Sequence, residues 1–160
     1  MHKAFISYHH ANDQKRADYL KKQYGNDVFI DRSLEEPFPD DMSEDDILAR
    51  IRQDYLKNST VTVVLVGSET YKRKWVDWEI YASLHPYGER TRNGLLGILL
   101  PGATSLPARL KDNVDSGYAV LMDWENISWQ LENKIDEAFY NRDFNYWINN
   151  TRSLRQRNGW

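Results

Sequence analysis

The chain of 160 residues contains no cysteine, which excludes disulfide bonds and thiolate chemistry. It has no run of 18 apolar residues, so we expect no membrane-spanning helix and no membrane partner. The amino terminus lacks the apolar core of a signal peptide, and we therefore expect a cytoplasmic protein. Lys and Arg number 21 against 24 Asp and Glu, a balance that argues against a nucleic-acid partner. A hydrophobic content of 41% fits one globular domain with a proper core.

Apolar and amphipathic segments alternate along the chain, as is typical of α/β proteins. Residues 61–66, VTVVLV, are apolar at nearly every position, which predicts a strand covered on both faces of a parallel sheet. The alternation predicts a doubly wound, mainly parallel five-stranded sheet with the flavodoxin-like order 2-1-3-4-5. The expected strands are Lys3–Tyr8, Asp27–Asp31, Val61–Val66, Gly94–Leu100 and Tyr118–Met122.

Four helices are expected around this sheet, each marked by a capping residue, a Gly or Pro stop, or an apolar stripe. The segment between the fourth and fifth strands has no clear periodicity and is expected to be a loop. We expect a domain over residues 1–144 and a tail over 145–160 that packs on the domain or acts as an interaction arm. The first helix is expected to open at Asn12 or Asp13 and to stop at Gly25, and the second to follow a Ser43–Asp46 capping box. The third is expected to follow Gly67-Ser68 and to end at Pro86, and the fourth to start near Ser128.

The predicted sheet order fixes where a ligand should bind. Such sheets bind ligands beyond the carboxyl ends of their strands where the strand order reverses, here between the first and third strands. Four separate segments converge on that crevice. Their residues are Ser7, Tyr8 and His9 after the first strand, Asp31 and Arg32 after the second, Gly67 and Ser68 after the third, and Glu79 in the following helix.

Glu79 is the strongest candidate for chemistry. At about 100° per residue it lies at the edge of an apolar stripe that includes Val76, between that stripe and the face of Tyr71 and Trp75. A half-desolvated carboxylate at this end of a sheet is typical of a functional site. The alternative is an ordinary helix-edge glutamate, solvated or paired with a lysine four residues away.

Three segments, FISYHH, DVFIDRS and SETYKRKWVDWE, resemble the landmark segments of TIR domains, and more narrowly the TIR-like proteins of the bacterial Thoeris anti-phage system. The resemblance covers most of Lys3–Phe139 and implies a TIR-like fold. It also implies that a glutamate in the helix after the third strand, here Glu79, cleaves the nicotinamide–ribose bond of NAD. The resemblance further implies a cyclic ADP-ribose-type product that activates a partner effector protein.

The chain departs from the usual TIR pattern at three places. Val76 stands where cysteine is commoner, and the gap from Tyr71 to Trp75 is one residue shorter than usual. Pro37-Phe38-Pro39 replaces the usual Pro-Gly of the loop after the second strand. Because that loop drives assembly in many TIR domains, we expect a monomer or small homo-oligomer and no filament.

NAD is expected to be a substrate and no cofactor is expected, because no GxGxxG motif follows the first strand. No metal is expected, since His9-His10 has no third ligand in register. Each predicted site residue also has a structural alternative: aromatic packing for Tyr71 and Trp75, helix capping for Ser68, and solvation for Asp31. Besides catalytic Glu79, the predicted substrate-binding residues are Tyr8, His9, Asp31, Ser68, Tyr71 and Trp75, with Arg32 and Arg73 as candidate phosphate partners.

Two other functions fit the same pattern. A non-enzymatic TIR-like interaction module would need no catalytic glutamate. A nucleoside 2-deoxyribosyltransferase-like enzyme shares the sheet type and uses a glutamate at an anomeric carbon. A phospho-receiver domain is excluded, because FISYHH supplies no acidic pair after the first strand.

Overall fold

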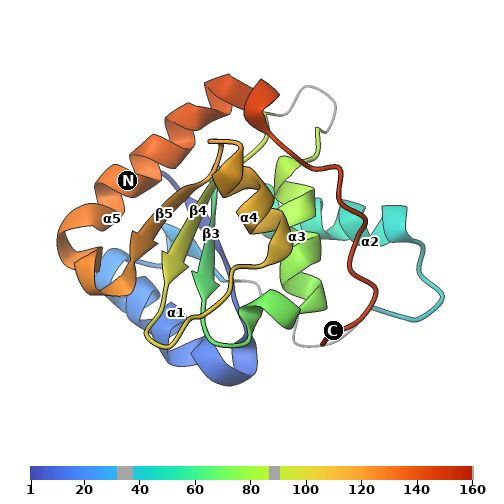
Figure 1. Ribbon diagram of the computed structural model, residues 1–160, viewed down its shortest axis with the longest axis horizontal. Helices are drawn as coiled ribbons and strands as arrows, with labels where there is room; N and C mark the ends of the chain where they lie inside the picture. Colours follow the sequence, from blue (N-terminus) through green and yellow to red (C-terminus); the bar gives the residue numbers. More distant parts are fainter. Residues whose placement is uncertain (32–37, 87–90, 160) are drawn as a thin grey trace.

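The computed structural model describes residues 1–31, 38–86 and 91–159. A five-stranded sheet of order β2-β1-β3-β4-β5 forms its centre (Figure 1), as the sequence predicted. Every pairing between neighbouring strands of this sheet is parallel. The strands are β1 (Ala4–Ser7), β2 (Phe29–Ile30), β3 (Val61–Val66), β4 (Gly94–Leu99) and β5 (Val120–Asp123).

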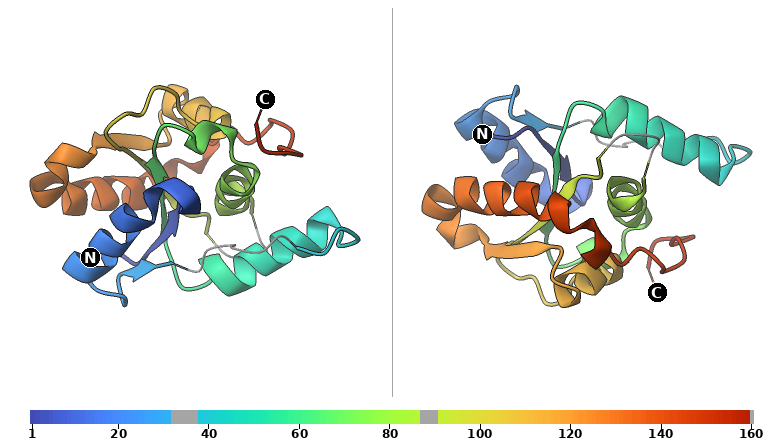
Figure 2. Two further views of the ribbon diagram at one scale, coloured as in Figure 1. Left: turned by 90° about the horizontal axis from the view of Figure 1, so that it is seen from below. Right: turned by 90° about the horizontal axis from the view of Figure 1, so that it is seen from above.

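Helices cover both faces of the sheet. Helices α1 and α5 lie on one face, and α2, α3 and α4 lie on the other (Figure 2). None of the described helices is both long and apolar enough to cross a membrane. The helices are α1 (His10–Tyr24), α2 (Glu44–Arg50) with its π-helical continuation η1 (Ile51–Leu56), α3 (Lys74–Leu84), α4 (Ala108–Asp115) and α5 (Ile127–Tyr140); short 3₁₀ turns are η2 (Thr70–Lys72), η3 (Trp124–Asn126) and η4 (Asn141–Trp147).

Local signals explain several of these boundaries. The Ser43 hydroxyl accepts a hydrogen bond from the Asp46 backbone N–H at 3.2 Å and so caps α2, as expected. Gly25, with φ of 98°, ends α1. Ser68 does not cap α3, because the 3₁₀ turn η2 intervenes and α3 begins only at Lys74. The expected capping role of Ser68 was therefore wrong.

The sequence did not predict α4, whose segment was expected to be a loop. Two of its three buried side chains are polar, Arg109 and Asn113, and only Leu110 is apolar. The apolar stripe of the eight-residue helix is therefore short, Leu110 and the half-buried Val114, and the helical period is weak in the sequence.

The fifth strand begins two residues later than expected. The Tyr118 carbonyl accepts from the Asn141 side chain at 3.1 Å, and the Ala119 N–H donates to the Asn113 carbonyl at 2.8 Å. These groups therefore do not pair with β4.

The alternation of β1 decides which residues face which helix layer. Ala4 and Ile6 join the core under α1 and α5, whereas Phe5 joins the core that contains Trp78 of α3. By the same period of two, Ser7 shares the α3 side with Phe5. Consecutive residues at the end of β1 thus serve opposite faces of the sheet.

The segment after η4 crosses the outer surface of α3 and α4 (Figure 1, dark red). The Trp78 indole N–H donates to the Arg155 carbonyl at 2.7 Å, and the Lys74 backbone N–H donates to the Asn158 side chain at 2.8 Å. The Gly159 backbone N–H donates to the Lys72 carbonyl at 3.0 Å. We call residues 148–159 the C-terminal strap. The division into a domain over 1–144 and a tail over 145–160 stays a prediction.

Candidate functional site

Glu79 is buried at the carboxyl edge of the sheet and contacts the end of β1. Its side chain is 5% exposed. The Ser7 hydroxyl donates a hydrogen bond of 2.7 Å to Glu79 Oε1. This contact joins two of the segments that were expected to converge, because β1 turns Ser7 toward α3. The structure thus brings Ser7 and Glu79 together in a site with almost no contact to water.

Burial changes the protonation of Glu79. Burial is the largest cause that raises the pKa of this carboxyl; the Ser7 hydrogen bond opposes it and the negative charge of Asp31 adds to it, so that the pKa rises from 4.5 to about 8. Without a ligand, Glu79 is therefore mostly protonated at neutral pH. A cation placed beside it would favour the ionised form. The electrostatics of the site respond directly to the charge of whatever binds there.

Asp31 lies just after β2 and is held by two donors. Its Oδ2 accepts from the Tyr8 hydroxyl at 2.9 Å and from Lys21 Nζ at 2.8 Å. Its side chain is 5% exposed, yet Oδ1 is a buried oxygen without a hydrogen-bond partner among the described residues. One carboxylate oxygen is thus fixed, and the other remains able to accept a hydrogen bond from a ligand.

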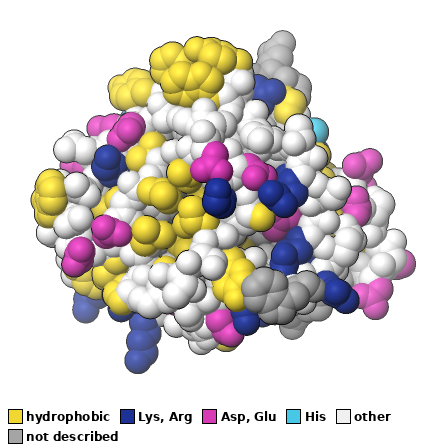
Figure 3. All heavy atoms as spheres, in the orientation of Figure 1, with side chains coloured by type: hydrophobic (Ala, Val, Ile, Leu, Met, Phe, Trp, Pro, Cys, Tyr) yellow, Lys and Arg dark blue, Asp and Glu magenta, His cyan; other side chains and the backbone are white. Residues whose placement is uncertain are grey.

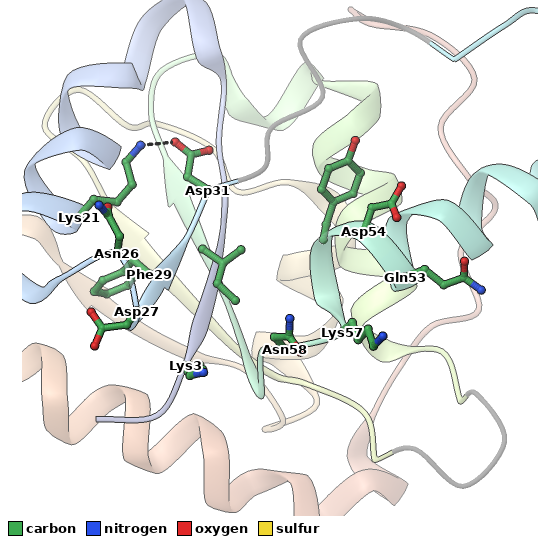
Figure 4. Close-up of a pocket in the computed structure, with 12 residues that line it drawn as sticks. Lys3, Lys21, Asn26, Asp27, Phe29, Asp31, Gln53, Asp54, Lys57 and Asn58 are labelled. Atoms are coloured by element: carbon green, nitrogen blue, oxygen red, sulfur yellow. Dashed lines mark hydrogen bonds and ion pairs between the residues drawn. The ribbon is translucent and has the colours of Figure 1, made fainter.

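A cavity of about 420 Å³ runs along the outer edge of β2, with Asp31 at its end. Figure 4 shows the Asp31 carboxylate turned toward Lys21, with Asp54 and Gln53 on the other side of the cavity. Among the described lining residues, Asp31 is the one that the sequence predicted for the site. Lys21 was not predicted, since nothing distinguishes it in sequence from other basic residues of an amphipathic helix.

His9 is the last residue before α1 and is 8% exposed. Burial, and next the charge of Arg73, lowers the pKa of its imidazole. Its Nδ1 is buried without a hydrogen-bond partner among the described residues. His9 is therefore neutral at physiological pH and belongs to the polar lining at the end of β1.

Gly67 lets the turn after β3 approach the start of α1. A Cβ at this position would lie 2.5 Å from Oδ2 of Asp13 in the first turns of α1. The Thr70 hydroxyl accepts the Gly67 backbone N–H at 2.8 Å, which closes the turn after β3. Burial raises the pKa of Asp13. A side chain at position 67 would displace the Asp13 carboxylate.

The other three predicted substrate-binding residues, Ser68, Trp75 and Tyr71, lie in three different parts of the structure. Ser68 is exposed in the turn after β3. Trp75 is half-buried and packs edge-on against Phe38 and Trp78, with ring centroids 5.3 and 5.5 Å away. Tyr71 lines a different cavity, next to α4. The structure therefore does not gather all of these residues around Glu79.

Arg73 and Arg32 were the two candidate phosphate-binding residues predicted from the sequence. Arg73 lines the same cavity as Tyr71, and Arg32 lies outside the described residues. Within the part of the chain that the structure describes, no group of three His, Asp or Glu side chains could hold a metal ion.

Comparison with known families places the site in a matched region. The family model described as Thoeris protein ThsB, TIR-like domain, matches residues 5–105. A search of curated proteins found no match. The matched region contains β1 to β4, α3 and every predicted site residue, whereas α4, β5, α5 and the C-terminal strap lie beyond it.

Proposed function

Because the chain belongs to the family of TIR-like domains of the Thoeris protein ThsB, we propose that it cleaves the nicotinamide–ribose bond of NAD. The product would be a cyclic ADP-ribose-type signal in anti-phage defence, and the partner would be an effector protein that this signal activates. The observation that carries the proposal is the buried carboxyl of Glu79 at the carboxyl edge of a parallel sheet, with its pKa raised to about 8.

The bond to be broken joins C1 of ribose to the ring nitrogen of nicotinamide. Its electron pair leaves with nicotinamide, which becomes neutral, and the ribose passes through an oxocarbenium-like state. Water attack on C1 would release ADP-ribose, with loss of a proton from the water. Attack by a nucleophile of the adenosine half would close a ring. An ionised Glu79 next to C1 would stabilise the positive charge that develops in either case.

Binding of NAD would change the protonation state of Glu79. The nicotinamide ring of NAD is a cation, and its approach would lower the pKa of Glu79 and release its proton. The buried carboxylate would then face the ring and ribose without competing water, where electrostatic interactions are strongest. Ser7, which donates to Oε1, would hold the carboxylate in one orientation.

Asp31 is proposed to position the substrate. Its Oδ1 has no hydrogen-bond partner among the described residues and could accept a ribose hydroxyl, while Tyr8 and Lys21 hold Oδ2. His9 and Ser68 would supply polar contacts at the ends of β1 and β3. Tyr71 and Trp75 would contribute aromatic surface only if the substrate reached beyond the Ser7–Glu79 contact.

The test is chromatography of NAD incubated with the purified chain, with and without a lysate of phage-infected cells. We expect nicotinamide together with a cyclic or linear ADP-ribose product. A parallel incubation with deoxynucleosides distinguishes the transferase-like alternative, which would exchange their bases and leave NAD intact. Intact NAD under all conditions, with the protein folded, would favour a non-enzymatic interaction module in which the Ser7–Glu79 contact is structural.

A further inference from the structure

A second cavity, of about 390 Å³, lies between the starts of α3 and α4 and the C-terminal strap. We call it the arginine pocket, because three of its lining residues are arginines from separate segments. Its lining residues are Tyr71, Arg73, Asp77, Pro107, Ala108, Arg152, Ser153 and Arg155.

The arginine pocket lies across α3 from the proposed NAD site. Asp77 and Glu79 are two positions apart on α3, which turns their side chains by about 200° from each other. Glu79 contacts Ser7 of β1, whereas Asp77 contacts Arg109 of α4. A ligand in the pocket would therefore not contact Glu79.

The pocket's acidic residue is already neutralised. Asp77 Oδ1 accepts from Arg109 Nε at 2.9 Å, and Oδ2 accepts from the Arg155 backbone N–H at 2.8 Å. Arg109 is fully buried, so this pair lies in a medium where an unbalanced charge is costly. The Asp77 side chain is thus bound to the buried Arg109 and makes no side-chain ion pair with a lining arginine among the described residues.

The lining arginines keep donors for a ligand. The Arg73 side chain has no hydrogen bond or ion pair with the residues that the structure describes, while its backbone N–H donates to the Thr70 carbonyl at 3.1 Å. Arg152 binds Asp112 through Nε and Nη2, at 2.9 and 3.0 Å. Arg155 uses Nε for the Lys72 carbonyl, at 3.2 Å. Figure 3 shows Lys and Arg side chains interspersed with Asp and Glu side chains over this region of α3, α4 and the strap.

Two helix starts add to the positive potential. Helix α3 begins after Arg73 and α4 after Pro107, and neither residue supplies a side-chain cap. Both helices point the positive ends of their dipoles toward the pocket, and the first N–H of α3 is already used, since Lys74 donates to the Asn158 side chain. Guanidinium groups with helix N-termini are the groups that bind phosphate oxygens in proteins.

We propose that the arginine pocket binds a small ligand with a diphosphate group, of the nucleoside-diphosphate class. Arginine matches phosphate oxygens with paired N–H donors, and the volume falls in the range of small-molecule sites. The Tyr71 ring and Pro107 supply the apolar surface for the nucleoside. Because Arg152 and Arg155 belong to the strap and Arg73 precedes α3, the ligand would bind the strap to the domain.

The test is isothermal titration of the full chain with inorganic pyrophosphate, ADP and adenosine. We expect pyrophosphate and ADP to bind and adenosine not to bind. Arg73→Gln should weaken pyrophosphate about tenfold or more, since it removes a charged donor. The matched control is Arg50→Gln on the exposed surface of α2, which makes the same charge change and should leave the affinity unchanged.

Arg152→Gln is a second variant, and because the Arg152 side chain is 49% exposed we expect this variant to fold like the parent. It should also weaken pyrophosphate. Glu79→Gln should keep full pyrophosphate affinity, so failure of the proposed NAD chemistry would not affect this result. Three outcomes would overturn the proposal: no pyrophosphate binding to the parent chain, affinity unchanged in both arginine variants, or affinity lost only in Glu79→Gln.

Discussion

Glu79 must satisfy two opposing demands at the residue scale. Burial favours its protonated form, with a pKa of about 8, whereas stabilising a ribosyl cation requires the ionised form. The proposed resolution is that the substrate brings the positive charge that ionises it. Ser7 contributes by holding one carboxyl oxygen at 2.7 Å in either state.

Glu79→Gln tests the charge and keeps the shape. We expect the variant to bind NAD while nicotinamide release falls by on the order of a hundredfold or more, the scale seen when one electrostatic stabiliser is removed. The measurement is nicotinamide and product formation by triggered protein. The matched control is Glu132→Gln on the exposed surface of α5, which should turn over at the parental rate. An active Glu79→Gln protein would show that the carboxylate is not the catalyst.

The same residue makes stability depend on pH. The folded-state pKa of Glu79, about 8, lies above its unfolded value of 4.5, so the unfolded state loses its proton first as pH rises. The contribution of protonated Glu79 to the free energy of unfolding is therefore complete below about pH 4.5 and is lost between that pH and about pH 8. Glu79→Gln should match the parent near pH 4 and exceed it above pH 8, by on the order of a few kcal/mol. Urea unfolding from pH 4 to 9 measures this difference, and equal pH profiles would contradict it.

At the element scale, α3 connects the two sites. One side carries Glu79 against β1, and the other carries Asp77 against α4 and the C-terminal strap. The strap is attached to this helix at several points, including the 2.7 Å hydrogen bond from Trp78 to the Arg155 carbonyl. The position of the proposed catalytic residue therefore depends on contacts made by the last residues of the chain.

Asp77→Ala tests that arrangement. The change leaves the fully buried Arg109 without its carboxylate, which should cost about 3–5 kcal/mol of unfolding free energy. Denaturant unfolding measures the loss. Asp112→Ala removes the partner of the half-exposed Arg152 and should cost below about 1 kcal/mol. Equal losses in the two variants would show that the buried pair is not what holds α3, α4 and the strap together.

At the scale of the whole molecule, the loop after β2 bears on assembly. It has Pro37-Phe38-Pro39 in place of Pro-Gly, and residues 32–37 lie outside the described part of the chain. Phe38 contacts Trp75 of its own chain, with ring centroids 5.3 Å apart. A side chain used in this way is less available to another copy.

We therefore expect a monomer or a small oligomer in solution without ligand. Light scattering over a hundredfold range of concentration should give a constant mass, or a mass that rises only to a small multiple of the monomer. Filaments that grow with concentration in the absence of ligand would contradict this expectation.

Local patterns in the sequence determined most of the fold. The continuous apolar run Val61–Val66 marked the central strand, and the Ser43 and Gly25 signals marked helix ends that the structure confirms. These features were readable because side-chain periodicity and capping act over a few residues. The same reasoning placed Glu79 on α3 at the carboxyl edge of the sheet.

Only the tertiary structure decided the surroundings of these residues. Ser7 and Glu79 are 72 positions apart, and Asp77 and Arg109 are 32 apart, so no local pattern links them. Helix α4 escaped prediction because two of its three buried side chains are polar and bind the strap, as in the bond from Arg109 to the Ser153 carbonyl. Burial, and with it the raised pKa of Glu79, depends on which distant segments pack together, and that is a property of the folded chain.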